Sequence, residues 1–199
     1  MATRKKRNGK SARPAAKPKR KQALTRRKHA PDAISLLKND HREVEGLFSQ
    51  FEAASGPARK KAIVQKICDA LTVHTTIEEV IFYPPARAAL KRAGEDLLDE
   101  AVVEHEGIKW RIELLKRMKP EDDLYDAEVK VLSEYVKHHV KEEERELFPK
   151  LRWSDFDNAG VGERLAARKE KMTGKRVKAE PSLLERGLDA LVGPSPGTI

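Results

Sequence analysis

Residues 74–84 read HTTIEEVIFYP, and residues 139–149 read HVKEEERELFP. Both stretches run from a histidine to a proline, and both place two adjacent glutamates at the same positions between them. This shared frame pairs His74 with Glu78 and His139 with Glu143. A separation of four residues puts both members of a pair on one face of a helix. The frame also selects His139, and not its neighbour His138, as the counterpart of His74.

Apolar residues recur every three or four positions through both stretches and through two further segments, which is typical of amphipathic helices. Glycine or proline interrupts this pattern at residues 56–57, 84–85, 120 and 149. Asp32, which follows Pro31, is expected to cap the first helix. Short connections between helices of similar length favour antiparallel neighbours. The sequence therefore predicts an all-α protein, an up-down-up-down four-helix bundle.

Each predicted helix carries one histidine on its apolar stripe. These are His41, His74, His105 and His139, and the intervals between them are 33, 31 and 34 residues. In an up-down bundle, near-equal intervals bring the four positions to a similar height along the bundle axis. A buried imidazole needs a hydrogen-bond partner or a metal. The spacing therefore predicts a site where the four side chains meet.

Four imidazoles and two carboxylates are more donors than one tetrahedral zinc ion takes. They suit two ions that accept both nitrogen and oxygen donors, and iron is the leading candidate. The predicted metal ligands, called the ligand set below, are His41, His74, Glu78, His105, His139 and Glu143. Glu45 is a further candidate, as a ligand or as a hydrogen-bond partner of an imidazole, or is an ordinary polar helix residue. Tyr135 is either a donor to a bound oxygen species or a core tyrosine.

These motifs resemble those of the hemerythrin-like, HHE cation-binding family. The similar stretches are Asp40-His41, His74-x-x-x-Glu78, Glu104-His105 and His139-x-x-x-Glu143 with the following Leu-Phe-Pro, and they span about residues 32–150. The resemblance implies a non-haem di-iron centre with an oxo or hydroxo bridge, terminal histidine ligands, and Glu78 and Glu143 as bridging ligands. Oxygen-carrying members of that family place a further histidine where this chain has Lys109, and use an aspartate arrangement in the fourth helix where it has Glu143. We therefore expect binding of or reaction with dioxygen, peroxide or nitric oxide, or iron sensing, and the alternatives of carrier, sensor and enzyme stay open.

Charge divides the chain into two parts. Residues 1–29 contain 13 Lys or Arg and no Asp or Glu, which leaves 28 basic and 32 acidic residues elsewhere. Residues 1–30 are poor in large apolar side chains and are predicted to be a disordered basic tail. Such a tail can bind nucleic-acid phosphates without sequence preference. The alternative function is therefore a DNA- or RNA-associated protein whose bundle is a structural or iron-sensing module. The candidate contacts are Arg4, Lys5, Lys6, Arg7, Lys19, Arg20, Lys21, Arg26, Arg27 and Lys28.

The remaining features bound the class of protein. No apolar run approaches the length of a membrane span, and the basic N-terminus lacks the apolar stretch of a secretory signal. The single cysteine, Cys68, excludes an internal disulfide. We expect a cytoplasmic protein with a bundle over residues 31–153, and association with the nucleoid if the basic tail binds DNA. Residues 154–199 are expected to form a charged, partly helical C-terminal extension.

Overall fold

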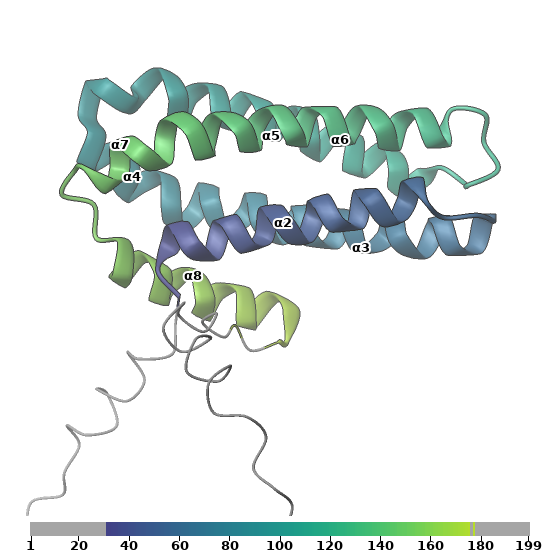
Figure 1. The fold of residues 1–199 in the computed structure, drawn as a ribbon, viewed down its shortest axis with the longest axis horizontal. Helices are drawn as coiled ribbons and strands as arrows, with labels where there is room; N and C mark the ends of the chain where they lie inside the picture. The colour runs from purple at the N-terminus through teal and green to yellow at the C-terminus, as the bar shows by residue number, and fades with distance from the viewer. Residues whose placement is uncertain (1–30, 176, 178–199) are drawn as a thin grey trace, which may run out of the picture.

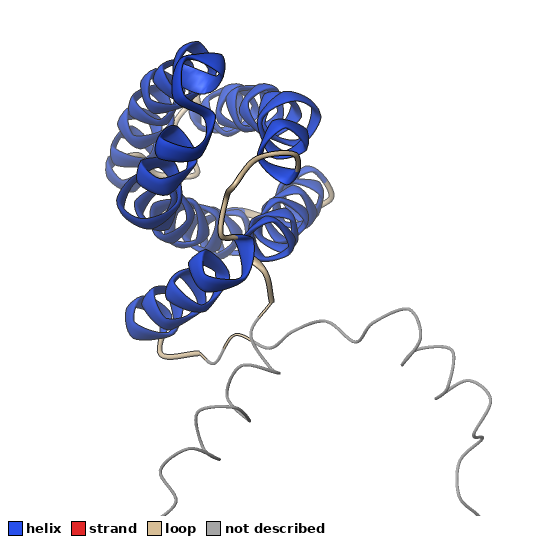
Figure 2. Cartoon of the chain, turned by 90° about the vertical axis from the view of Figure 1, so that its left-hand side faces the viewer, coloured by secondary structure: helices blue, strands red, loops and turns tan. Residues whose placement is uncertain are grey.

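The computed structural model describes residues 31–175 and 177, so the predictions for the basic tail and for most of the last 24 residues lie outside the described residues. Four long helices run antiparallel to their neighbours, which confirms the predicted bundle (Figure 1). They are α2 (Ala33–Glu52), α3 (Pro57–Ile77), α5 (Glu95–Arg117) and α6 (Tyr125–Glu142). Viewed end-on they form a ring (Figure 2), and no strand occurs in the part of the chain that the structure describes.

The helix boundaries follow local sequence signals. Asp32 caps α2 as predicted, because its side chain accepts a hydrogen bond from the Ser35 amide at 2.9 Å. Gly56 precedes α3 with φ of 82°, a left-handed conformation that glycine tolerates. Pro57 then begins the helix, where its missing N–H would have had no partner.

The two histidine-to-proline stretches share a local structure that the sequence prediction did not include. α3 passes into a π-helical turn, η1 (Glu78–Phe82), and α6 passes into a second one, η3 (Glu143–Leu147). The amide of the residue before each proline bonds the carbonyl of Glu78 or Glu143, five residues back. Each turn therefore begins at a glutamate of the ligand set, and π turns are frequent at functional sites.

The prolines therefore do not end these helices. The chain continues as α4 (Tyr83–Leu90), which includes Pro84, and as α7 (Phe148–Arg152), which includes Pro149. The expectation that Pro149 interrupts the fourth helix was wrong, because the chain stays helical through this residue to Arg152. The π turn shifts the hydrogen bonding, so that each proline falls in the first turn of a new helix, where no N–H is needed. A short 3-10 turn, η2 (Lys91–Gly94), connects α4 to α5.

A further helix, α8 (Asn158–Thr173), packs against α2 (Figure 1). Val161, Leu165 and Ala166 of α8 are buried in the same apolar cluster as the start of α2. Asn158 accepts a hydrogen bond from the Ile34 amide at 3.0 Å, which fixes the beginning of α8 against the beginning of α2. This part of the predicted C-terminal extension is therefore continuous with the core.

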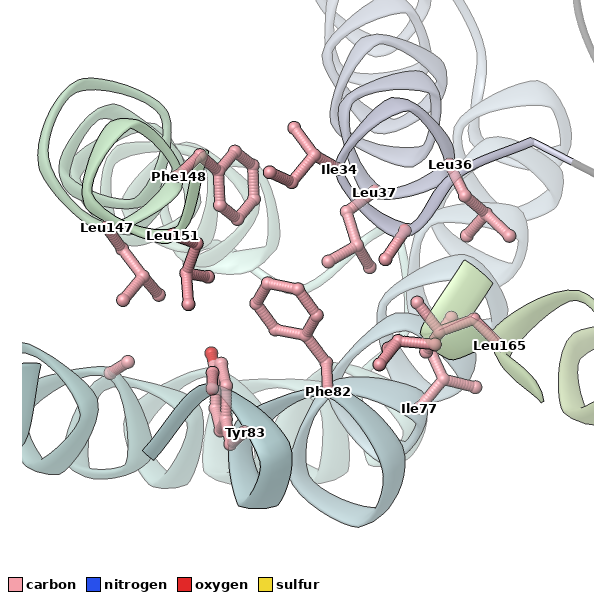
Figure 3. Close-up of a cluster of buried hydrophobic side chains, with 14 of the residues drawn as sticks. Ile34, Leu36, Leu37, Ile77, Phe82, Tyr83, Leu147, Phe148, Leu151 and Leu165 are labelled. Carbon is pink, nitrogen blue, oxygen red and sulfur yellow. The ribbon is translucent and has the colours of Figure 1, made fainter. Parts of the chain in front are cut away.

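Two apolar clusters fill the bundle, one on each side of the four histidines. In α2, Leu37 belongs to one cluster and Val44 to the other, and His41 lies between them. In α3, which runs in the opposite direction, Leu71 belongs to the cluster of Val44 and Ile77 to the cluster of Leu37, and His74 lies between them. In Figure 3, Phe82 points into the first cluster, towards Leu37 and Phe148. A polar layer therefore separates two dry halves of the core.

Candidate metal centre

The structure brings all six members of the ligand set into that polar layer. Every one of them is at most 5% exposed. His41 comes from α2, His74 and Glu78 from the junction of α3 with η1, His105 from α5, and His139 and Glu143 from the junction of α6 with η3. The four histidines thus lie at a similar height along the bundle axis, as the intervals between them in the sequence predicted.

Their donor atoms form two groups that share one glutamate. His41, His74, Glu78 and Glu143 offer atoms that all lie within 4.8 Å of one another, and so do Glu78, His105 and His139. The histidine Nε2 atoms face the carboxylates. His74 Nε2 lies 3.1 Å and His105 Nε2 lies 3.3 Å from Glu78 Oε2. His41 Nε2 lies 3.4 Å and His139 Nε2 lies 3.7 Å from Glu143 Oε2.

Several of these buried atoms make no hydrogen bond with any group in the described part of the chain. They are His41 Nε2, both ring nitrogens of His74, both carboxylate oxygens of Glu78, and Glu143 Oε2. Buried polar atoms without partners cost free energy. Their concentration at one point is the pattern expected of donors that bind a metal ion.

The other ring nitrogen of each histidine faces an acidic residue. The Nδ1 atoms of His41, His105 and His139 lie 2.9 Å from carboxylate oxygens of Glu144, Glu79 and Glu104. His74 Nδ1 lies 3.7 Å from Asp40 Oδ2. A carboxylate beside Nδ1 fixes the ring orientation and leaves Nε2 free for a metal. We call Asp40, Glu79, Glu104 and Glu144 the outer carboxylates.

Each outer carboxylate in turn contacts a basic side chain. Lys38 lies 2.8 Å from Glu144, Lys109 lies 3.0 Å from Glu79, and His138 lies 3.3 Å from Glu104. Lys169 of α8 pairs with Asp40. The centre is therefore built in concentric layers of alternating charge, from Glu78 and Glu143 through the histidines and the outer carboxylates to basic side chains.

Tyr83 is a further member of the site. Its hydroxyl is buried and donates to Glu143 Oε1 at 3.1 Å, and it lies 3.3 Å from His105 Nε2. Burial, together with the negative charge of Glu143, raises the pKa of Tyr83 well above its usual value, so the phenol keeps its proton. It is a proton-bearing donor at the inner face of the site.

Charge interactions outweigh burial in the imidazoles of His74 and His139. Burial by itself lowers the pKa of His74, but Glu78 and Asp40 raise it to about 10. The pKa of His139 is also raised, against the effect of burial, by Glu143 and Glu104. Burial by itself raises the pKa of Glu78, but the neighbouring imidazoles, His74 above all, hold it well below its usual value. The carboxylates of the polar layer therefore stabilise positive charge on the groups beside them.

Two sequence predictions differ from the structure. Tyr135 was placed on the inner face, but it is 44% exposed, and its ring contacts the Arg111 guanidinium at 4.8 Å and lies over Gly107. The inward line of α6 runs through Leu132 and Val136, which places Tyr135 at the side facing α5. Tyr135 is therefore not positioned to contact a bound oxygen species.

Glu45 is exposed and is not among the clustered donors. The inward line of α2 continues from His41 to Val44 and Phe48, so a residue four positions after His41 points outward. Its interpretation as a metal ligand has no support in this geometry. The choice of His139 agrees with the geometry, since its side chain is 2% exposed and that of His138 is 58% exposed.

Sequence reasoning missed the roles of the outer carboxylates and of Tyr83. A signal was present, because an acidic residue stands directly beside a member of the ligand set in Asp40-His41, Glu78-Glu79, Glu104-His105 and Glu143-Glu144. Adjacent residues point in different directions on a helix, so each outer carboxylate reaches a histidine of a neighbouring helix. Tyr83 carried no comparable signal.

Comparison with known proteins agrees with this geometry. A structure from Mycobacterium kansasii, described as a hemerythrin HHE cation-binding domain-containing protein, is similar with a TM-score of 0.62 and 25% identity, over 72% of this chain and 88% of that one. A curated relative from Nostoc sp., named DNA nickase, is 28% identical over 117 residues, which are 59% of this chain but only 32% of the relative. This chain thus matches about a third of that relative's length.

The model of the hemerythrin HHE cation-binding domain matches residues 32–151, the part of the chain that holds all six residues of the ligand set. The chain therefore belongs to the hemerythrin HHE cation-binding family and has a metal-binding, hemerythrin-like bundle.

Proposed function

We propose that this protein holds two iron ions through His41, His74, Glu78, His105, His139 and Glu143, and binds or reacts with dioxygen, peroxide or nitric oxide. The observation that carries the proposal is the set of buried donor residues that converge from four helices, among which the donor atoms of His41, His74, Glu78 and Glu143 include several without a hydrogen-bond partner in the described chain. In an apolar core, such atoms are costly unless a cation satisfies them.

The donor arrangement favours two ions over one. The donors form two groups, and Glu78 belongs to both, which is the geometry expected of a bridging carboxylate. Four imidazoles with two carboxylates exceed a tetrahedral zinc site, and the mixture of nitrogen and oxygen suits iron. Two irons held here would supply redox chemistry towards a small oxygen- or nitrogen-containing ligand.

The residues of the chain give that chemistry a defined setting. The outer carboxylates hold the imidazoles with Nε2 directed inward. The Tyr83 hydroxyl donates its one proton to Glu143 from the inner face, so it would donate to a ligand only in exchange for this bond. The apolar clusters on both sides exclude water and strengthen these electrostatic contacts.

Lys109 favours reaction or sensing over reversible oxygen carriage. Its Nζ lies 3.0 Å from Glu79 and 2.5 Å from Glu106, so the side chain serves an outer carboxylate. The position where oxygen carriers have another histidine therefore contributes no imidazole. Fewer nitrogen donors leave more positions open to exogenous ligands.

The test is metal content with a matched pair of histidine variants. The purified chain should contain about two iron ions per chain and show near-ultraviolet absorption when oxidised. His139→Ala should lose iron, whereas His138→Ala, which removes an exposed partner of Glu104 but no donor atom of the centre, should still load iron. Equal iron loading in both variants, or a wild-type chain that binds no iron, would contradict the proposal.

A second candidate function is nucleic-acid association through residues 1–30. It is favoured by the 13 basic and absent acidic residues in positions 1–29, and the name of the Nostoc relative is compatible with it. Binding to phosphates should weaken steeply with salt. DNA affinity should therefore fall when the chain starts at Pro31, and fall in the full chain when salt is raised. Equal affinities of the two chains would dispose of this candidate.

A further inference from the structure

A groove lies on the surface between α2 and α6, beside the metal centre. Its volume is about 460 Å³, which is within the range of small-molecule sites. The lining combines apolar side chains with charged ones: His41, Arg42, Glu45, Phe48, Val136, Lys137, Val140, Lys141, Glu144 and Arg145.

The groove and the centre share a wall. His41, Val136 and Val140 line the groove, and they also line a cavity of about 10 Å³ between the histidines. One layer of side chains therefore separates the groove from the buried donor atoms. His41 belongs to the ligand set and to the groove, so a molecule in the groove lies next to a metal ligand.

The positive charge of the groove is only partly compensated by its own acidic side chains. Four basic side chains line it against two acidic ones, and one of the acids, Glu144, already contacts Lys38 and His41. In the range 31–175, neither Lys137, Lys141 nor Arg145 forms an ion pair, although Lys38, Lys109 and Lys169 all do so near the centre.

The proximity of three cations in the groove costs stability. Lys137 and Lys141 of α6 are four residues apart on one helix face, where like charges repel, and Arg145 of η3 lines the same groove. Folding therefore gains nothing from placing them together. A ligand of opposite charge would remove the repulsion.

We propose that this groove is a binding site for a small anion on its way to the metal centre. The proposal rests on the di-iron function proposed above and adds a ligand class to it: small anions are concentrated at the centre, and neutral ligands such as dioxygen and nitric oxide are not. A cleft lined by one sign of charge raises the association rate of oppositely charged ligands by roughly 10- to 1,000-fold.

Azide and nitric oxide separate this charge effect from general access. Both are small and both can bind iron, but only azide is negatively charged. In the iron-loaded protein at low salt, Lys137→Glu with Lys141→Glu should lower the association rate of azide by about 10-fold or more and leave that of nitric oxide unchanged. Raised salt should reduce the difference.

The matched control changes the same charge elsewhere. Lys130 and Lys150 are exposed and do not line the groove. The variant Lys130→Glu with Lys150→Glu should therefore bind azide at the wild-type rate. Equal azide rates in the groove variant and this control would overturn the proposal, and so would an equal loss of azide and nitric oxide binding.

A metal-free experiment keeps the proposal testable if iron does not load. Inorganic phosphate added to the metal-free full chain should shift the NMR signals of amides 137–145, with saturation. The groove variant should lose this response and the control variant should keep it. Phosphate shifts that are absent in the wild-type chain, or unchanged in the groove variant, would overturn the site independently of the iron proposal.

Discussion

Lys169 of α8 donates to Oδ1 of Asp40, whose other carboxylate oxygen lies 3.7 Å from Nδ1 of His74. Asp40 is 6% exposed, so this contact is largely shielded from water. The residues matched by the family model end at 151, whereas α8 begins at Asn158. A helix outside the matched domain therefore supports one histidine of the ligand set (Figure 1).

This relationship predicts an effect of Lys169→Met on the metal. Without the lysine, Asp40 lacks its cationic partner and orients His74 less firmly. Residues that support metal ligands are worth 10- to 100-fold in affinity, and we expect about 3- to 10-fold here because Lys169 acts through Asp40. Chelator competition measures it. Lys169→Arg should restore most of the affinity, and Lys171→Met should have no effect. A wild-type affinity in Lys169→Met would show that α8 does not influence the centre.

The outer carboxylates should matter more directly. Glu104→Gln retains the shape of the side chain but removes the charge beside Nδ1 of His139. We expect metal affinity to fall by about 10-fold or more. Glu113→Gln, on the same helix but paired with Lys116 away from the centre, is the control. The idea fails if chelator competition gives the same affinity for both variants.

The two tyrosines make a matched pair. Tyr83→Phe removes the hydroxyl that donates to Glu143, and leaves a buried carboxylate oxygen without this partner, which costs about 1–3 kcal/mol of folding free energy. The absorption spectrum of the iron-loaded protein should also change. Tyr135→Phe, at an exposed position, should alter neither. Denaturant unfolding and the spectrum test both statements, and a spectral change in Tyr135→Phe alone would reverse the assignment.

Cys68 offers a pH-dependent probe of the core. Burial raises the pKa of this thiol from 9.0 to about 11. Because the folded pKa lies above the unfolded one, this stabilising contribution is complete below pH 9.0 and is lost as pH rises through about 11. At pH 8 a thiol reagent should therefore react slowly with the folded chain and quickly with the unfolded one. Metal removal should accelerate the reaction by increasing opening. Rapid labelling of the metal-loaded chain would contradict this placement.

Phe82 should be among the most sensitive core positions. It is fully buried, and its ring lies close to that of Phe148 (Figure 3) and packs edge-on against the rings of Phe148 and Phe156. Phe82→Ala should cost about 3–5 kcal/mol of unfolding free energy. Val80→Ala in the same π turn changes a 62% exposed side chain and should cost less than about 0.5 kcal/mol. Denaturant unfolding compares them, and similar midpoints would show that Phe82 does not anchor the core.

The predicted bundle and the six positions of the ligand set could be reached from the sequence because both depend on periodicity. Apolar residues at helical spacing fix which face of each helix turns inward. One histidine per stripe, at intervals of 33, 31 and 34, then fixes the layer in which they meet. The internal match of residues 74–84 with 139–149 identified His139 over His138, which the geometry supports.

Periodicity has limits that Tyr135 and Pro149 illustrate. Tyr135 stands four residues before His139. Four residues rotate an α-helix by more than one full turn, so Tyr135 lies beside the line of buried residues on α6 and not on it. The π turn before Pro149 changes the hydrogen-bond register of the helix. Pro149 therefore lies in the first turn of α7, where its missing N–H is tolerated, and does not end the helical segment. Such register changes leave little trace in an apolar pattern.

The sequence by itself determined the four long helices, their inward faces and the six candidate donor residues, because these follow from spacing along one chain. Only the tertiary structure decided which carboxylate orients which histidine, that Tyr83 and not Tyr135 reaches the site, and that Lys169 of α8 supports Asp40. Contacts between helices depend on how they rotate and pack against one another. No pattern within a single helix specifies that arrangement.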